Sequence, residues 1–291
     1  MQSVSEIKQQ DLLFEEEIGS DKDTFVRVEE KFFLPERNCD FALEVLEKTL
    51  EPCYPIVGTK FTKIESVYFD SSSLDIFRSH FYSRDSRFKI RTRKYAPNGM
   101  WPTGLRELEP AHVELKVKEN NICKKSRFQV GPSESTLLMQ GSTIAPTFDL
   151  QIRNPDLKFK TLMKRVDRVN SKLLNFQLKP QSIITYDRKA YEKNGLRITI
   201  DQNIQTKILG EVAEDVKNSI FLDSHLWTLS QQMRERHKQE KYFVLEVKHS
   251  GQIPLWVNEL INYTQSQKVS FSKYIFSLSD HLYREKLNHA C

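Results

Sequence analysis

The sequence FKIRTRKY at residues 88–95 alternates basic and apolar side chains over most of its length. Lys89, Arg91 and Arg93 occupy every second position, and Ile90 lies between two of them. Successive side chains of a β-strand point to opposite faces of a sheet, so residues two apart share a face. The stretch therefore predicts a strand with one basic face and one largely apolar face.

The same alternation recurs in five other predicted strands, among them HVELKVK at residues 112–118. For any single strand, the ordinary explanation is a sheet with one solvated face. Two features of the set favour a charged interior instead. Like charges side by side, such as Arg91 and Arg93, are unfavourable on a sheet, and the rows mix Arg or Lys with Glu. The six rows are Arg27, Glu29 and Lys31; Lys89, Arg91 and Arg93; His112, Glu114, Lys116 and Lys118; Tyr186 and Arg188; Arg197, Thr199 and Asp201; and Glu246 and Lys248.

The net charge of the chain is concentrated on this predicted face. Eight basic and three acidic residues leave an excess of five positive charges, which equals the formal net charge of +5 for all 291 residues. A nucleic-acid-binding protein should instead expose a basic stripe with aromatic residues beside it, so we expect no nucleic acid partner. The residues counted are Arg27, Lys31, Arg91, Arg93, Lys116, Arg188, Arg197 and Lys248, against Glu29, Glu114 and Glu246.

Converging cations of this kind require an anion. Two like charges about 4 Å apart repel by roughly 4 kcal/mol at an effective dielectric constant of about 20. A chain of phosphates relieves that repulsion, because Arg binds phosphate oxygens through two parallel hydrogen bonds and Lys supplies a point charge. The carboxylates are hard oxygen donors that suit Mg²⁺ or Mn²⁺ bridging the same phosphates.

The remaining pattern predicts an α+β domain. We expect a flexible lead over residues 1–23 and one domain over residues 24–291. Many consecutive strands linked by hairpins favour an antiparallel sheet of about eight strands, closed into a barrel-like tunnel with helices packed outside. An Asn-Gly pair at residues 194–195 predicts a tight hairpin. Expected strands are 24–34, 60–70, 86–95, 111–118, 163–173, 182–191, 196–204 and 242–249; expected helices are 36–50, 73–81, 133–140, 211–238 and 254–286, the last broken at 267–271.

Composition predicts a cytoplasmic protein. The chain is 38% hydrophobic and 29% charged, which is enough to bury a core. Its four cysteines are widely spaced and form no CxxC pair, as in proteins with reduced thiols. We find neither a signal peptide pattern nor an apolar stretch long enough to span a membrane.

The charged strands, in their order and spacing, resemble the VTC (vacuolar transporter chaperone) polyphosphate polymerase domain, a branch of the triphosphate tunnel metalloenzymes. The resemblance extends from Arg27 to Leu282. It implies a tunnel in which basic side chains bind a nucleoside triphosphate or polyphosphate. Its landmarks are RVEEKFFL, SVYFDSSSLDIF, FKIRTRKY, VELKVKE with KKSRF after it, ITYDRKAY, LRITIDQNI, YFVLEVKHS and FSKY.

The resemblance also implies roles for individual residues. Glu246 matches a metal-binding glutamate, and Glu29 and Glu114 of the charged face are further candidate ligands for Mn²⁺ or Mg²⁺. Lys125 or Arg127 matches a further basic contact, and the charged face adds Arg27 and Lys248 as phosphate-binding candidates. The matched phosphate-binding residues are Lys31, Arg91, Arg93, Lys116, Arg188, Arg197 and Lys273, of which Arg91, Arg93, Lys116 and Lys273 are the candidate catalytic residues.

Three functions remain open at this point. The first is a polyphosphate polymerase that transfers the γ-phosphate of ATP to the end of a polyphosphate chain. The second is a triphosphatase or tripolyphosphatase, in which water is the acceptor, and the third is a protein that binds polyphosphate without catalysis. The ExExK signature of the wider superfamily reads here as Arg27-Val28-Glu29-Glu30-Lys31, which predicts one tightly held metal rather than two. The chain lacks the membrane-spanning and phosphate-sensing segments of fungal relatives, so a membrane partner would be a separate protein.

Overall fold

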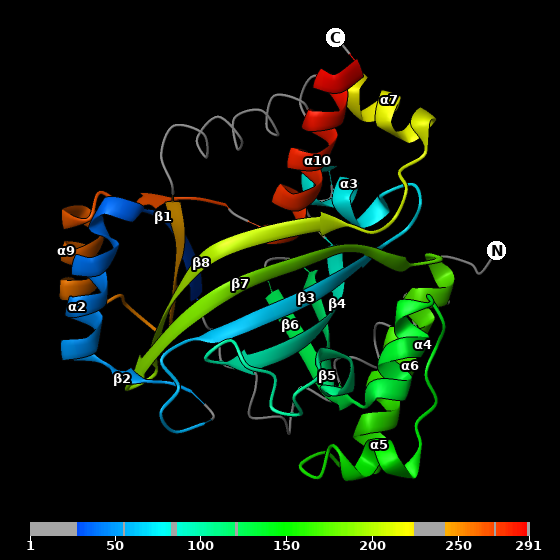
Figure 1. The fold of residues 1–291 in the computed structure, drawn as a ribbon, viewed down its shortest axis with the longest axis horizontal. Helices are drawn as coiled ribbons and strands as arrows, with labels where there is room; N and C mark the ends of the chain where they lie inside the picture. The colour runs from blue at the N-terminus through cyan, green and yellow to red at the C-terminus, as the bar shows by residue number, and fades with distance from the viewer. Residues whose placement is uncertain are drawn as a thin grey trace.

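An antiparallel sheet of ten strands forms the centre of the protein (Figure 1). The computed structural model describes residues 28–54, 56–82, 86–119, 122–223, 242–270 and 272–289. Eight of the strands contain eight or more residues, which agrees with the predicted number of about eight, and seven of them lie at predicted positions. They are β1 (Val28–Pro35), β3 (Thr62–Asp70), β4 (Ser86–Pro97), β5 (Ala111–Glu119), β6 (Ile122–Val130), β7 (Lys179–Lys193), β8 (Leu196–Ile208) and β9 (Tyr242–His249); the two short ones are β2 (Glu51–Pro52) and β10 (Gln267–Lys268).

The sheet is not closed by backbone pairing in the described part of the chain. Its strand order is β10-β1-β9-β8-β7-β3-β4-β5-β6, with β2 beside β7. Side chains satisfy the outer edge of β6: Asn154 bonds both the N–H and the carbonyl of Gln129, at 2.7 and 2.8 Å, and Arg165 donates to the carbonyl of Arg127 at 2.7 Å. An edge covered in this way pairs with no further strand. The antiparallel sheet is therefore confirmed, whereas the predicted closed barrel is not.

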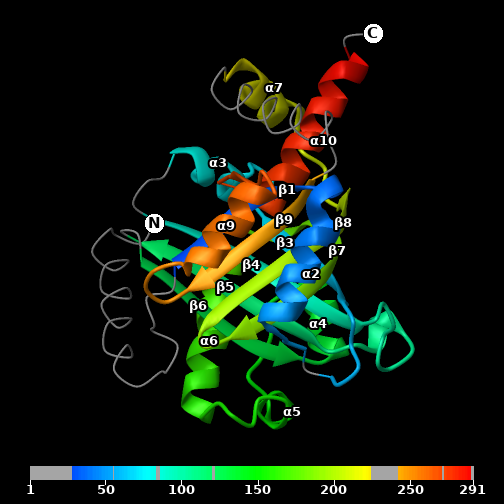
Figure 2. The same cartoon turned by 90° about the vertical axis from the view of Figure 1, so that its left-hand side faces the viewer.

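Helices lie on the outer side of the curved sheet, which places the alternate residues of the strands on its inner side. Figure 2 shows α2 (Cys39–Thr49) and α9 (Leu255–Tyr263) side by side over the β1–β9–β8 end. None of the described helices is long and apolar enough to cross a membrane. The other helices are α3 (Asp75–Tyr82), α4 (Pro132–Met139), α5 (Phe148–Ile152), α6 (Phe159–Asn175), α7 (Glu214–Leu222) and α10 (Lys273–His289), with short 3₁₀ turns at η1 (Glu36–Asn38) and η2 (Arg106–Leu108).

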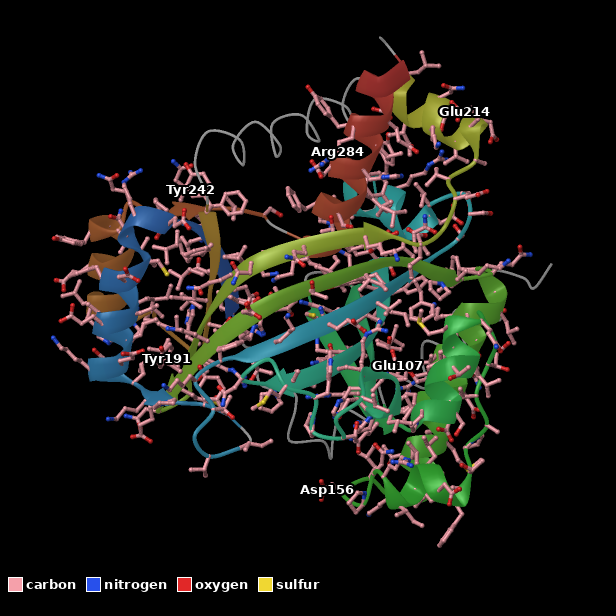
Figure 3. The ribbon with its side chains drawn as sticks, viewed as in Figure 1. Glu107, Asp156, Tyr191, Glu214, Tyr242 and Arg284 are labelled. Atoms are coloured by element: carbon pink, nitrogen blue, oxygen red, sulfur yellow. The ribbon has the colours of Figure 1, made fainter. Side chains whose placement is uncertain are left out.

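The apolar rows of the strands build the core. Ile90 and Leu115 belong to a large cluster that also contains Leu162 and Val166 of α6. A second cluster joins α2 and α9 to β8 and β9. Figure 3 draws the side chains on the ribbon and labels Arg284 on α10. Because the apolar rows face the helices, the charged rows face inward.

One predicted element is wrong, and one observed strand was not predicted. Residues 163–173 are helical, within α6, because Leu162, Val166, Val169 and Leu173 are buried at the spacing of three and four residues that a helix requires. Residues 122–130 form strand β6, which the sequence pattern did not indicate. Consecutive lysines on opposite faces of β6 hide its alternation.

Other predicted elements are confirmed. Asn194 and Gly195 have φ of 51° and 79°, the left-handed values of a two-residue hairpin turn between β7 and β8. The helix expected over residues 211–238 is present as α7, and residues 224–238 lie outside the described part of the chain.

Candidate functional site

Strand register brings opposite charges face to face on the inner side of the sheet. Arg91 lies directly opposite Glu114, and Glu114 lies opposite Arg127 on its other side. Lys31 lies opposite Glu246 in the β1–β9 pair. Directly opposed side chains in an antiparallel pair are about 5 Å apart at Cβ, which suits ion pairs. The inner side therefore consists of adjoining ion-pair groups.

The first group surrounds Glu114, which is only 2% exposed. Arg91 Nε donates to one carboxylate oxygen at 2.7 Å, and its Nη2 forms an ion pair with the same oxygen at 2.6 Å; Lys125 donates to the other oxygen at 2.9 Å. Arg93 and Arg127 approach to 3.8 and 3.6 Å. Burial raises the pKa of Glu114, but Arg91, Arg93 and Lys125 outweigh it and hold the pKa far below its ordinary value. Glu114 is therefore a buried anion shared by four cations.

Aromatic and hydroxyl groups orient the two central arginines. Arg91 donates to the Tyr68 hydroxyl at 2.8 Å, and its guanidinium lies 5.7 Å from the centre of the Tyr68 ring. Arg93 donates to Ser66 Oγ at 3.2 Å and is 6% exposed. Both guanidinium groups are thus fixed before any ligand binds, which reduces the entropy lost on binding.

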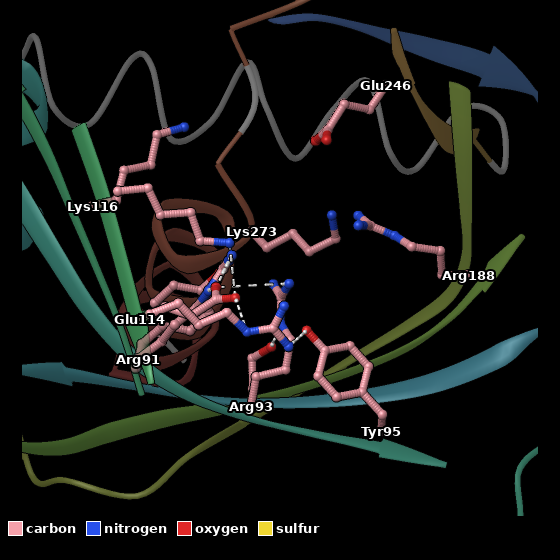
Figure 4. A network of polar contacts seen from close by, with 12 residues as sticks. Arg91, Arg93, Tyr95, Glu114, Lys116, Arg188, Glu246 and Lys273 are labelled. Carbon is pink, nitrogen blue, oxygen red and sulfur yellow. Dashed lines mark hydrogen bonds and ion pairs between the residues drawn. The ribbon is translucent and has the colours of Figure 1, made fainter. Parts of the chain in front are cut away.

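The second group surrounds Asp201, which is fully buried. Arg188 donates to both of its oxygens at 2.5 and 2.7 Å, and Lys273 forms an ion pair with it at 2.5 Å. The Lys273 ammonium also lies 4.5 Å from the centre of the Tyr186 ring. Figure 4 shows Arg188 and Glu246 on the side of the interior opposite Arg91, Arg93 and Glu114, with Lys273 between them.

The third group contains two carboxylates, Glu29 and Glu246. Lys31 lies 3.0 Å from Glu29 and 3.8 Å from Glu246, and Lys248 lies 3.8 and 2.6 Å from the same two groups. Lys116 reaches Glu29 at 3.6 Å. Since Lys116 is on β5 and Glu29 is on β1, this contact joins strands that do not pair. The sheet therefore curves until its two ends are linked across the interior by side chains.

These carboxylates are held in the ionised form. Burial and the neighbouring Glu246 raise the pKa of Glu29, but Lys31, Lys248 and Lys116 together lower it below its ordinary value. Burial also raises the pKa of Glu246, yet its basic neighbours, Lys248 first among them, bring it well below. Neither group is available as a proton acceptor near neutral pH.

Most of the predicted site residues meet in these three groups. Arg197 does not: it is more than one-third exposed and lies 3.6 Å from Glu192 at the hairpin end of β8. Arg27 lies outside the described residues. The residues brought together are Lys31, Arg91, Arg93, Lys116, Arg127, Arg188, Lys248 and Lys273, with Glu29, Glu114 and Glu246.

The sequence pattern did not assign roles to Asp201, Tyr68 or Lys89. Asp201 and Lys89 belong to the alternating rows, so the alternation could have indicated both. Tyr68 lies on a largely buried strand, and only its register opposite Arg91 places its hydroxyl in the site.

The arrangement of carboxylates limits where a metal could bind. In the described ranges, no three His, Cys, Asp or Glu side chains gather as a metal site. Glu29 and Glu246 share two lysine partners, and such a pair fits Mg²⁺ or Mn²⁺, which proteins often hold with one or two carboxylates plus substrate phosphates. Glu114 fits less well, because four basic side chains surround it. Burial lowers the pKa of His112 to about 4, and no second histidine lies at ligand spacing.

Comparison with known proteins gives one strong match. The sequence model of the VTC domain matches residues 26–280. No curated protein matches the chain.

Solved structures give weaker similarity. The PH1819 protein from Pyrococcus horikoshii OT3 is 14% identical, with 87% of this chain and 99% of that chain covered and a TM-score of 0.38. A protein from Bacillus halodurans described as a "putative adenylate cyclase" is 10% identical, with 85% and 94% covered and a TM-score of 0.43. Similarity at this level carries no inference about function.

Proposed function

The chain belongs to the VTC domain family, and we propose that it is a metal-dependent phosphotransferase that moves the γ-phosphate of ATP onto a polyphosphate chain. The supporting observation is the excess of basic over acidic side chains on the inner side of the sheet, with Arg91, Arg93 and Arg188 fixed and largely buried there. Buried charges are costly unless they are paired. A polyphosphate supplies the negative charge that the internal carboxylates leave uncompensated.

Binding would place the triphosphate between the Glu114 group and the Asp201 group. Arg91 and Arg93 would each donate to phosphate oxygens from one side, and Arg188 and Lys273 from the other. These donors are held by Tyr68, Ser66 and Asp201, so little reorganisation is needed when the phosphate arrives.

Transfer would depend on neutralising the charge of the γ-phosphoryl group. That charge spreads over three equatorial oxygens as the bond to the leaving oxygen breaks. Arg91, Arg93, Lys116 and Lys273 are the candidates to stabilise it. Glu246, with Glu29 beside it, would hold a divalent cation, which would supply positive charge close to the bound phosphates.

The state of the carboxylates favours a phosphate acceptor over water. Water must lose a proton when it attacks, which requires a general base with a pKa near the working pH. Glu29, Glu114 and Glu246 all have lowered pKa values because of their basic neighbours. The terminal oxygen of a polyphosphate is already anionic and needs no base, which agrees with the proposed polymerase activity.

The test is a product assay. Purified protein is incubated with ATP and Mn²⁺ or Mg²⁺, and long-chain polyphosphate and orthophosphate are resolved and measured separately. Polymer formation would support the proposal, and its loss in Arg91→Ala but not in the exposed Arg284→Ala would assign it to this site. Orthophosphate alone would indicate a triphosphatase. Neither product, with thermal stabilisation by tripolyphosphate, would indicate a binding protein.

A further inference from the structure

Lys89 of β4 lies next to the proposed site without an acidic partner. Its ammonium donates to Ser272 Oγ at 2.9 Å. Within the described ranges, no carboxylate lies at ion-pair distance from it. Burial lowers the pKa of Lys89 to about 7, and the nearby Arg87, Lys31, Lys116 and Arg91 contribute in the same direction. The neighbourhood of Lys89 is therefore positively charged and lacks an anion.

A ring nitrogen of the half-buried His80 of α3, near Lys89, also has no hydrogen-bond partner among the described residues. His80 Nδ1 is inaccessible to solvent and forms no hydrogen bond. Burial, together with Lys89, Arg87 and Lys31, lowers the pKa of His80 to about 3, so the imidazole is neutral at physiological pH. In its Nδ1–H tautomer, a neutral histidine donates a hydrogen bond to an anion without adding charge.

The start of α10 completes this corner. The helix begins at Lys273, directly after Ser272. The first N–H groups of a helix lack intrahelical partners, and the positive end of the helix dipole lies there. Helix N-termini of this kind bind phosphate groups. Here the positive end of α10 adds to the positive charge around Lys89 and to the hydrogen-bond donor of His80, so all three favour an anion in this corner.

The corner is continuous with the main site. Lys89 is two residues before Arg91 on the same face of β4, which is roughly 6 to 7 Å along the strand. It lies directly opposite Lys116 on β5. A phosphate chain bound by Arg91 and Lys116 that continues along β4, from Arg91 toward its N-terminal end, therefore reaches Lys89.

We infer that Lys89, His80 and Ser272 form a further subsite that binds the distal phosphates of a chain longer than a triphosphate. The inference rests on the proposed function for the identity of the ligand. The subsite favours longer chains over a triphosphate centred between the Glu114 and Asp201 groups, because the distal phosphates of a longer chain add contacts with Lys89. It also sets the direction in which a long chain leaves the main site.

The experiment compares two probes by isothermal titration calorimetry: tripolyphosphate and a longer linear polyphosphate of uniform length. For Lys89→Gln, we expect the affinity for the longer chain to fall at least tenfold, while the affinity for tripolyphosphate stays within about twofold of wild type. The exposed Lys63→Gln is the control and should change neither. His80→Ala is a second variant that should reduce selectivity for the longer chain.

A pH series gives an independent readout. Because Lys89 must be protonated to bind an anion, the preference of the wild type for the longer chain should be greater at pH 6 than at pH 8.5. Tripolyphosphate has the same terminal phosphate groups as the longer chain. Protonation of these groups therefore changes both affinities in the same way and cancels in the ratio of the affinity for the longer chain to that for tripolyphosphate. The pH dependence of that ratio should be absent in Lys89→Gln.

The possible failures are distinguishable. Equal affinities for both probes in the wild type would overturn the subsite and leave the proposed function standing. Equal losses for both probes in Lys89→Gln would place Lys89 in the main site and also overturn it. If the wild type binds neither probe, both the subsite and the proposed function are wrong. Lys89→Gln should unfold at the same or a higher temperature than wild type without ligand, because it removes an uncompensated buried charge.

Discussion

Replacing Glu114 by Gln removes the anion on which four basic side chains converge, and we expect the unliganded protein to lose stability. Glu114 is 2% exposed, and Arg91 and Lys125 are within 3 Å of its oxygens. Removing one partner of a buried ion pair typically costs about 3 to 5 kcal/mol, because the other charge remains buried. Gln keeps one acceptor oxygen, so a loss of about 3 kcal/mol is expected.

The assay is thermal and urea unfolding with and without tripolyphosphate. For a domain of this size, a loss of about 3 kcal/mol corresponds to a fall of roughly 6 to 12 °C in Tm. Tripolyphosphate should stabilise the variant more than the wild type, because a ligand that binds only the folded state stabilises it more the tighter it binds. The phosphate supplies the negative charge that Gln lacks.

Glu119→Gln on the same strand is the matched control. Glu119 is 35% exposed and lies 3.7 Å from Lys124, and surface ion pairs of this kind contribute only about 0 to 1 kcal/mol. If Glu114→Gln were as stable as wild type without ligand, or if ligand stabilised both equally, the reasoning about a cation-rich interior would be refuted.

The effect of Glu114 depends on pH in a defined direction. Its pKa is lower in the folded state than the ordinary value of 4.5, so its contribution is fully present above that value. The contribution is lost as pH falls through the lower pKa of the folded state. The difference between wild type and Glu114→Gln should therefore be constant above about pH 5 and decrease below it.

Three further changes test the site and the fold. Arg91→Ala should weaken tripolyphosphate binding at least tenfold in calorimetry. It should cost less stability than Glu114→Gln, because Glu114 still has its other basic neighbours when Arg91 is replaced. Binding of tripolyphosphate as tight as in the wild type would contradict the inward position of Arg91. Tyr274→Phe should lower the free energy of unfolding by about 1 to 3 kcal/mol, because the hydroxyl donates to the buried Asp70 carboxylate. Burial raises the pKa of Asp70 to about 6, so the loss measured by urea unfolding should be larger at pH 8 than at pH 5. Gly195→Ala should cost about 1 kcal/mol in thermal unfolding, since its φ of 79° is unfavourable for other residues, and an unchanged Tm would contradict the turn geometry.

The charged faces of the strands could be predicted because alternation is a local property. Once the apolar row of β4 packs against the helices, Arg91 and Arg93 must face the other way. The same argument places Glu114 on the inner side of β5 and Glu246 on the inner side of β9. These positions required no knowledge of strand order.

The grouping of those residues required strand order, which is not a local property. Glu29 and Glu246 share partners because β1 pairs with β9, although the two strands are far apart in the sequence. Glu114 has basic partners because β5 lies between β4 and β6, and β6 was not predicted. Sequence reasoning therefore placed three carboxylates in one candidate metal site, whereas the structure distributes them over two groups.

The wrong assignment of residues 163–173 has a different cause. The spacing of apolar residues in a short segment fits both a strand and a helix, and only a longer segment distinguishes the two. Extending the segment back to Leu162 reveals the period of three and four residues that the buried face of α6 follows. The open edge of β6 was likewise unpredictable, since Asn154 and Gln129 are distant in sequence.

If the chain is a polyphosphate polymerase, as we propose, its internal carboxylates affect how a growing polymer would slide through the binding site after each addition. If Arg91, Arg188 and Lys273 had no partners, each phosphate would be held strongly and the polymer would stall. Glu114 and Asp201 form ion pairs with these side chains in the unliganded protein, so a carboxylate would replace each phosphate that leaves. The energies of successive steps would then be more even, and a bound polymer could advance one unit at a time.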